Sequence, residues 1–257
     1  MKSILFFLLL CSANWALACR CMTPTLQENI YSKDFIATAK ILKINQDSSN
    51  QEYHEVEVEL IELYKGVKVS KLKIWSAQMT SCSFYTPVGT TWLIFANYNK
   101  DKTLSFHYCS GSVQIDRIFD LAKYPQLDKN YASGINLKLD VLKFFRDKKL
   151  MPANKAQLKI SYPSECFKKL KGFEGLKRDF AIYECTVNED MSISSVKEIT
   201  GFNNKKLSAK FLSCIKSELR NNDSNTKSIS KKTKQLLVYY YYPAEKTDKS
   251  FVTTFDL

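Results

Sequence analysis

The sequence predicts a mixed protein in which a small β-barrel or sandwich is followed by a helical connector and an α+β domain. Short runs rich in β-branched and aromatic residues, separated by turn residues, fill positions 33–110. Apolar residues then recur at helical spacing over 116–155, and a strand, turn, strand, helix and strand follow in order up to the C-terminus. These observations predict three units: 19–118, 119–154 and 155–257.

Composition and charge narrow the classes of partner. The chain has 257 residues, of which 45% are hydrophobic and only seven are glycine, so it can form well-packed hydrophobic cores. The formal net charge is +12, but the excess is dispersed over the second half in pairs such as Lys205-Lys206 and Lys231-Lys232. A nucleic-acid site would instead need a dense basic stripe with stacking aromatic residues. We therefore expect no nucleic-acid partner.

Residues 1–18 have the pattern of a cleavable signal peptide. Lys2 precedes the apolar run Ile4–Leu10, and Ala16-Leu17-Ala18 forms an A-x-A cleavage site. The apolar run is too short to span a bilayer and no later segment is apolar enough, so we expect no transmembrane segment. The expected location is secreted or periplasmic, where disulfides persist. The alternative is an outer-membrane lipoprotein with a lipid anchor on Cys19, although Ala16 replaces the Leu usual in such signals.

The stretch 54–60 has the clearest strand pattern. Val56, Val58 and Leu60 alternate with Glu55, Glu57 and Glu59, so that one face is apolar and the other charged. Further strands are expected at Phe35–Ile44, Leu72–Trp75, Thr91–Ala96 and Thr103–Tyr108. Because no long helix intervenes, these strands favour a small barrel or sandwich.

The second half mixes helices and strands. In the connector, apolar residues from Leu137 to Phe145 recur at helical spacing in a charged background, which predicts one or two helices. The expected elements that follow are a short helix from Ser164, strands at Phe180–Val187 and Ile193–Ile199, an amphipathic helix on Leu207, Phe211, Ile215 and Leu219, and a last strand at Gln235–Tyr242.

The sequence offers little for catalysis. Both histidines, His54 and His107, lie in expected strands, and Val58 stands where a zinc-protease helix would carry its second ligand. No P-loop, G-x-G-x-x-G, G-x-S-x-G or C-x-x-C motif occurs. We expect a protein without enzymatic activity, catalytic residues, cofactor or bound metal. The alternative of an envelope enzyme would need a polar pocket converging on one of the histidines.

The cysteines favour structural disulfides, which an exported protein retains. The mature chain would keep Cys19, Cys21, Cys82 and Cys109 in the first unit and Cys166, Cys185 and Cys214 in the second. Cys19 and Cys21 point to opposite sides of an extended chain, so each needs its own partner downstream, and four cysteines allow three pairings. In the second unit we expect Cys166 to pair with Cys214 and Cys185 to be a reduced core residue.

The first unit resembles a known family. A mature N-terminus Cys19-Arg20-Cys21, two later cysteines, and the motifs Glu62–Gly66, Thr80–Cys82, Val88–Ala96 and Tyr108–Gly111 are similar to the netrin-like domain of the tissue inhibitors of metalloproteinases, especially its bacterial type. The resemblance covers residues 19–118. It implies an OB-fold barrel with disulfides Cys19–Cys82 and Cys21–Cys109.

In those inhibitors the α-amino group and carbonyl of the first cysteine chelate the zinc of the protease, and Cys19 is the matching position. An amine with a pKa near 8 gives up its proton readily to a metal. The next residue enters the specificity pocket of the protease and is small in effective inhibitors, whereas here it is Arg20. A long charged side chain is costly in an apolar pocket unless it is paired.

The second unit resembles the C-terminal domain of TonB-type proteins. The similarity rests on Tyr162-Pro163, Gly175, the strand ending at Cys185-Thr186-Val187, its return at Ile193–Val196 and a helix before a last strand. In TonB this fold binds a peptide strand along its sheet edge, which implies that Tyr239, Tyr240, Tyr241 and Tyr242 form a partner-binding edge. Packing of the tyrosines against the helix is the alternative.

We therefore expect a two-domain, exported and non-enzymatic module that binds another protein of the envelope or extracellular space. The alternative is an inhibitor of zinc metallopeptidases that acts through Cys19 and Arg20.

Overall fold

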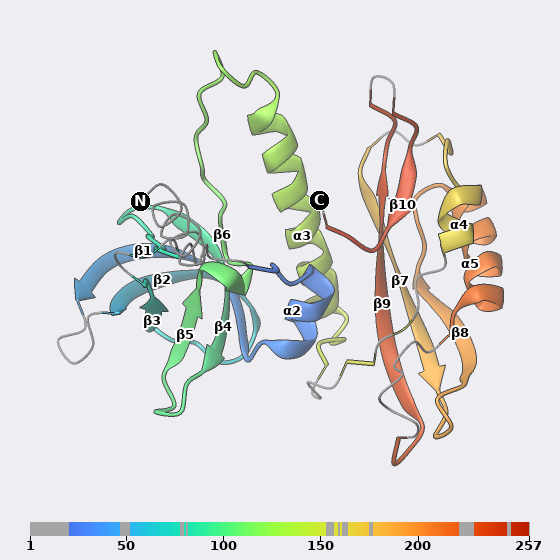
Figure 1. The fold of residues 1–257 in the computed structure, drawn as a ribbon, viewed down its shortest axis with the longest axis horizontal. Coiled ribbons are helices and arrows are strands. Elements are labelled where there is room, and N and C mark those ends of the chain that lie inside the picture. Colours follow the sequence, from blue (N-terminus) through green and yellow to red (C-terminus); the bar gives the residue numbers. More distant parts are fainter. Residues whose placement is uncertain are drawn as a thin grey trace, which may run out of the picture.

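The computed structural model describes residues 21–256 except 47–51, 78–79, 81, 153–156, 159, 161–163, 175–176, 221–228 and 246–247. It contains a closed five-stranded β-barrel, a separate four-stranded sheet, and helices between and beside them (Figure 1). None of the helices in the described part of the chain is long and apolar enough to cross a membrane.

The barrel consists of β1 (Phe35–Gln46), β2 (Tyr53–Lys65), β3 (Lys71–Trp75), β4 (Thr91–Tyr98) and β5 (Leu104–His107). The strand order is β1-β2-β3-β5-β4, and pairing of β1 with β4 closes the barrel. All of these pairs are antiparallel except β3 with β5. The predicted alternation in β2 is confirmed, because Val56 and Val58 are buried in the barrel interior while Glu59 is exposed.

Two helices cover one side of the barrel. The short helix α2 (Leu26–Ser32) begins with a capping box between Thr25 and Glu28, and α3 (Leu127–Asp147) is the helix predicted in the connector. A short strand β6 (Val113–Gln114) pairs with β4 before the chain reaches α3.

The second sheet has the order β10-β9-β7-β8 and is antiparallel throughout. Its strands are β7 (Asp179–Val187), β8 (Ile193–Thr200), β9 (Thr233–Tyr242) and β10 (Phe251–Thr253). The helices α4 (Ser164–Lys169) and α5 (Lys205–Glu218) lie on one face of this sheet, and α3 lies toward the other (Figure 1). The sheet is therefore the middle layer between two sets of helices.

The three predicted units share one hydrophobic core. Leu93 and Phe95 of the barrel, Leu142 and Phe145 of α3, and Val238 of β9 belong to the same buried cluster. A second cluster fills the barrel, and a third lies between the sheet and the helices α4 and α5. The helical connector thus acts as a packing layer between the barrel and the second sheet.

Met191 ends the β7–β8 turn in a conformation that usually requires glycine. Its φ angle is +68°, in the left-handed region, where a non-glycine residue is disfavoured. Its side chain is nevertheless 5% exposed and packs in the core under α5. Burial of this apolar side chain offsets the backbone cost, which explains how the turn tolerates a non-glycine residue at position 191.

Candidate functional site

A disulfide between Cys21 and Cys109 attaches the N-terminal segment to the barrel. The two Cα atoms are 5.4 Å apart, and the bond joins residues separated by 88 positions. This is the pairing that the family resemblance implies. Cys82 is also disulfide-bonded, but its expected partner Cys19 and the neighbouring Arg20 lie outside the described residues.

His107 supports the turn that carries Cys109. The turn is a short 3-10 helix, η2 (Tyr108–Ser110), and the Nδ1 atom of His107 accepts a hydrogen bond from the backbone N–H of Cys109 at 3.2 Å. Burial, together with the positive charge of Lys33, lowers the pKa of His107 below its usual value. The neutral ring can therefore continue to accept this hydrogen bond.

The histidines have structural contacts rather than a shared pocket. His107 packs edge-on against Trp75, and Nδ1 of His54 lies 2.9 Å from the hydroxyl of Ser76. Three cavities lined by described residues, of about 200, 420 and 660 Å³, have neither histidine in their walls.

Exposed apolar side chains surround the pinned segment. Met22, next to Cys21, is 95% exposed, and Tyr108, next to Cys109, is 50% exposed. The ring of Phe84 lies 6.3 Å from that of Tyr108, and the following residue, Tyr85, is also exposed. We call Cys21, Met22, Tyr85, Tyr108 and Cys109 the N-terminal ridge. The disulfide restricts the backbone of the two segments that carry Met22 and Tyr108, which lowers the backbone entropy lost on binding.

A small cavity of about 200 Å³ is lined by residues that follow Met22 in the chain. Its wall includes Thr23, Asn29, Gly111, Lys138 and Asp256. Gly111 has a φ angle of +81°, and a Cβ atom there would lie 2.7 Å from Nδ2 of Asn29, so the close approach requires glycine. The cavity therefore joins the N-terminal segment, α2, α3 and the C-terminal segment.

The tyrosine run of β9 is not the free edge that the TonB resemblance implied. β9 pairs with β7 along its length, and Tyr240, Tyr241 and Tyr242 also pair with β10 on the other side. Earlier in β9, the N–H of Leu236 donates to the hydroxyl of Tyr31 and the N–H of Val238 donates to the side chain of Gln27. Side chains of α2 thus complete the hydrogen bonding of β9 where β10 does not reach.

All four tyrosines are buried, on alternate faces of the sheet. Tyr239 and Tyr241 belong to the core beneath α4 and α5, whereas Tyr240 and Tyr242 belong to the core shared with α3. The tyrosines therefore pack against helices, which was the alternative to a partner-binding edge. Among the described strands, β8 pairs with β7 alone and is the long strand at an edge of this sheet.

The cysteines of the second unit are placed as expected. Cys166 of α4 is bonded to Cys214 of α5, with their Cα atoms 5.7 Å apart. Cys185 of β7 is a buried free thiol whose pKa is raised to about 12 by burial. It is therefore a protonated, apolar core residue.

A cleft between α3 and the second sheet was not predicted. A cavity of about 660 Å³ lies there, and Lys177, Asp179 and Asn203 in its wall also line a second cavity of about 420 Å³, which has no described α3 residue in its wall. Burial raises the pKa of Asp179 although the N–H groups of Asn203 and Phe180 donate to its carboxylate. No sequence pattern predicts this cleft, because its walls come from α3, β7 and the β8–α5 loop, which are distant in the chain.

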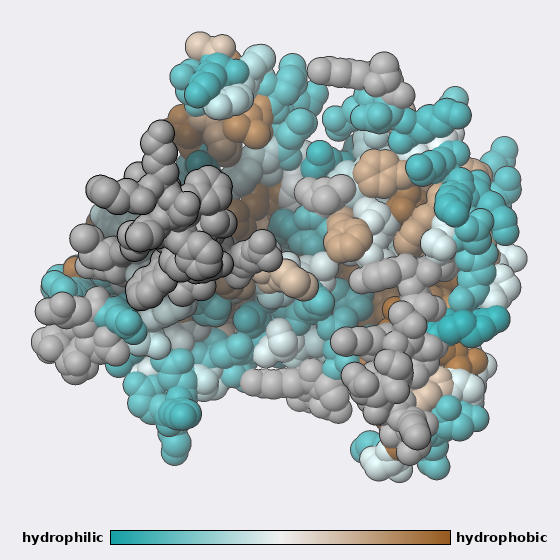
Figure 2. All heavy atoms as spheres, in the orientation of Figure 1, coloured by the Kyte–Doolittle hydropathy of each residue, from teal (hydrophilic) through white to brown (hydrophobic). Residues whose placement is uncertain are grey.

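A second exposed apolar segment precedes α3. Ile118 is 91% exposed, and Leu121 and Tyr124 are about half exposed. Figure 2 shows apolar atoms at the surface beside this β6–α3 segment, at the upper left of the molecule. This segment can serve as a control for the N-terminal ridge, because it is similarly exposed and apolar but contains no disulfide.

No protein-family model matches the sequence, and no curated protein matches it.

Proposed function

We propose that this chain is an exported, non-enzymatic module that binds another protein through the N-terminal ridge. The observation that carries the proposal is Met22, which is 95% exposed beside a disulfide. Contiguous exposed apolar patches on a protein surface commonly mark interaction sites, and the exposed Tyr85 and Tyr108 of the ridge extend the apolar surface offered by Met22. Two disulfides between described residues support export to an oxidising compartment.

The strand order supports a netrin-like OB-fold for the first unit. An OB-fold is a five-stranded Greek-key barrel, and the order β1-β2-β3-β5-β4 with closure through β1 and β4 agrees with that description. The Cys21–Cys109 bond is a further point of agreement with the family pattern. In the second unit, the order α4-β7-β8-α5-β9 supports the TonB-C-like assignment.

Site-specific photo-crosslinking tests the role of the ridge. A photoreactive amino acid is placed at Met22 of the full chain, and at Ile118 as a control of similar exposure, 95% against 91%. In cells that express the protein, we expect one discrete adduct from position 22 that is absent from position 118. Tyr108→Ala should weaken this adduct because it removes the adjacent exposed ring. Equal labelling at both positions, or none at position 22, would contradict the proposal.

Inhibition of a zinc metallopeptidase is the second candidate. The Cys21–Cys109 disulfide favours it, because it anchors the chain two positions after Cys19, whose α-amino group would meet the protease. Arg20 would have to enter the specificity pocket, so the protease would need an acidic group there.

The proposal that the chain inhibits a zinc metallopeptidase can be tested directly. Mature protein beginning at Cys19 is assayed against zinc metallopeptidases beside a form with one additional N-terminal residue. Chelation by the α-amino group requires that only the first form inhibits. If both forms behave alike, zinc chelation through Cys19 is excluded.

A further inference from the structure

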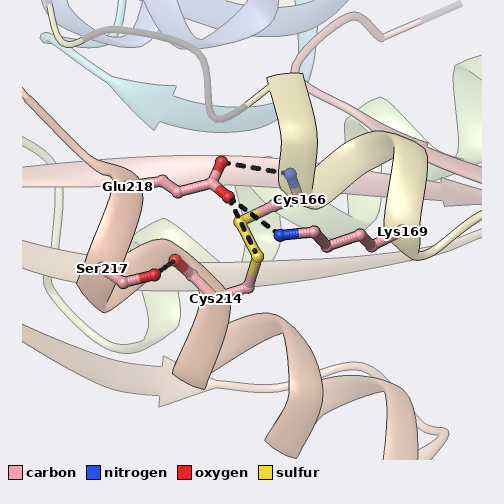
Figure 3. Close-up of a disulfide and its surroundings, with 5 residues drawn as sticks. All are labelled: Cys166, Lys169, Cys214, Ser217 and Glu218. Atoms are coloured by element: carbon pink, nitrogen blue, oxygen red, sulfur yellow. Dashed lines mark hydrogen bonds and ion pairs between the residues drawn. A yellow bond between two sulfur atoms is a disulfide. The ribbon is translucent and has the colours of Figure 1, made fainter.

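Three potential metal ligands meet where α4 contacts α5. The sulfur atoms of Cys166 and Cys214 and a carboxylate oxygen of Glu218 all lie within 4.8 Å of one another. Cys214 and Glu218 are four residues apart on α5 and so lie on the same face of the helix. Cys166 comes from α4, and Figure 3 shows its disulfide directly beside the Glu218 side chain.

The carboxylate is held in place by two further groups. The backbone N–H of Cys166 donates to Oε2 of Glu218 at 3.1 Å, and Nζ of Lys169 lies 3.7 Å from Oε1 (Figure 3). Such contacts to a ligand oxygen are typical of metal sites, where outer groups orient the ligands. The hydrogen bond from Cys166 also gives Glu218 a purely structural role as a cap of α4, which any test must separate from metal binding.

The third contact of Glu218 is not a hydrogen bond while the disulfide is intact. Oε1 lies 3.7 Å from the sulfur of Cys214, but a sulfur in a disulfide has no proton to donate to a carboxylate. A tetrahedral zinc ion, with Zn–S near 2.3 Å and Zn–O near 2.1 Å, requires S and O ligands about 3.6 Å apart. The observed separation therefore suits two ligands of one ion better than it suits a hydrogen bond.

We propose that opening the Cys166–Cys214 disulfide creates a binding site for a thiophilic divalent cation of the zinc type. The ligands are the two cysteine thiolates and the Glu218 carboxylate, with a water molecule in the fourth position. Once the disulfide is open, the two sulfurs must lie about 3.8 Å apart to bind one tetrahedral ion, a separation that side-chain rotation can supply. This inference does not depend on the protein-binding role proposed above.

The chemistry needs a reductant, which we take to be an external dithiol. Its thiolate attacks the sulfur of Cys214, the half-buried member of the pair, because Cys166 is fully buried. Two electrons pass from the dithiol to the protein, so that the dithiol becomes a disulfide and Cys166 and Cys214 become thiols. The cation then displaces one proton from each thiol, and Glu218 and Lys169 balance the charge of the resulting site.

Cobalt binding to the full chain tests the proposal. After reduction with a phosphine, we expect added Co²⁺ to give a sulfur-to-cobalt charge-transfer band and the visible bands of tetrahedral coordination, and Zn²⁺ to abolish both. The oxidised protein should give neither. Glu218→Gln keeps an oxygen for the N–H of Cys166 but removes the charge, and should weaken Co²⁺ binding at least tenfold. The Cys166→Ser/Cys214→Ser double variant should lose the bands.

Reduction also opens the Cys21–Cys109 disulfide, so folding is followed by circular dichroism in the same samples. If the reduced chain unfolds, recovery of the native spectrum on addition of Zn²⁺, but not in the double variant, supports the site. The proposal is overturned if the reduced wild type gives no charge-transfer band, or if Glu218→Gln binds Co²⁺ as tightly as the wild type.

Discussion

Two buried tyrosines, Tyr31 and Tyr240, differ in whether the hydroxyl group has a partner. The Tyr31 hydroxyl accepts a hydrogen bond from the N–H of Leu236 at 2.8 Å and so completes the edge of β9. The Tyr240 hydroxyl is fully buried and has no hydrogen-bond partner among the described residues. Burial raises the pKa of both groups, so both stay protonated and differ only in hydrogen bonding.

We predict opposite effects when each hydroxyl is removed. Tyr31→Phe should lower the free energy of unfolding by about 1–3 kcal/mol, because it leaves the buried N–H of Leu236 without an acceptor. Tyr240→Phe should leave stability unchanged or raise it by up to about 1 kcal/mol. Urea denaturation measures both. A Tyr240→Phe variant as unstable as Tyr31→Phe would show that the Tyr240 hydroxyl has a partner.

At the scale of elements, the C-terminal segment connects α2 with α3. Asp256 accepts a hydrogen bond from the N–H of Leu26 at 3.1 Å, and its carboxylate forms an ion pair with Lys138. The two side chains are only 12% and 20% exposed, so solvent screens this pair much less than a surface pair. The last described residue of the chain therefore stabilises the beginning of a helix near the N-terminus.

Removal of the Asp256 carboxylate should lower the stability of the protein. Asp256→Ala leaves Lys138 without its ion-pair partner and the N–H of Leu26 without its acceptor, and should reduce the free energy of unfolding by about 1–3 kcal/mol. The control is Glu55→Ala, because the Glu55–Lys71 pair lies on the surface and should contribute no measurable stability. Equal losses for the two variants in thermal or urea unfolding would contradict a special role for Asp256.

At the scale of the whole molecule, the core shared by the barrel, α3 and the second sheet should couple their unfolding. Leu142 of α3 is fully buried and belongs to the same hydrophobic cluster as Phe95 of the barrel and Val238 of the sheet. A helix packed on both sides cannot lose its contacts to one unit without exposing apolar surface of the other.

Leu142→Ala should therefore lower the free energy of unfolding by about 2–5 kcal/mol and leave a single transition. Leu42→Ala is the matched control, since Leu42 lies on the barrel surface and is 50% exposed, and its loss should be small. Calorimetry and circular dichroism distinguish the outcomes. Two separate transitions in the wild type, with only one shifted by Leu142→Ala, would show that the units unfold independently.

The sequence alone determined the local structure and the chemistry of the cysteines. The alternation of Val56 and Val58 with glutamates and the helical spacing of Leu137 to Phe145 are short-range patterns, and both produce the predicted elements. The tertiary structure alone decided that Tyr239–Tyr242 lie inside the sheet, because β10 and side chains of α2 meet β9 from opposite ends of the chain. The tertiary structure also forms the cleft beside Asp179 and places Glu218 next to the Cys166–Cys214 disulfide. Local periodicity specifies which face of a helix or strand is apolar. Which other elements pack against that face depends on contacts between residues up to 230 positions apart in the chain.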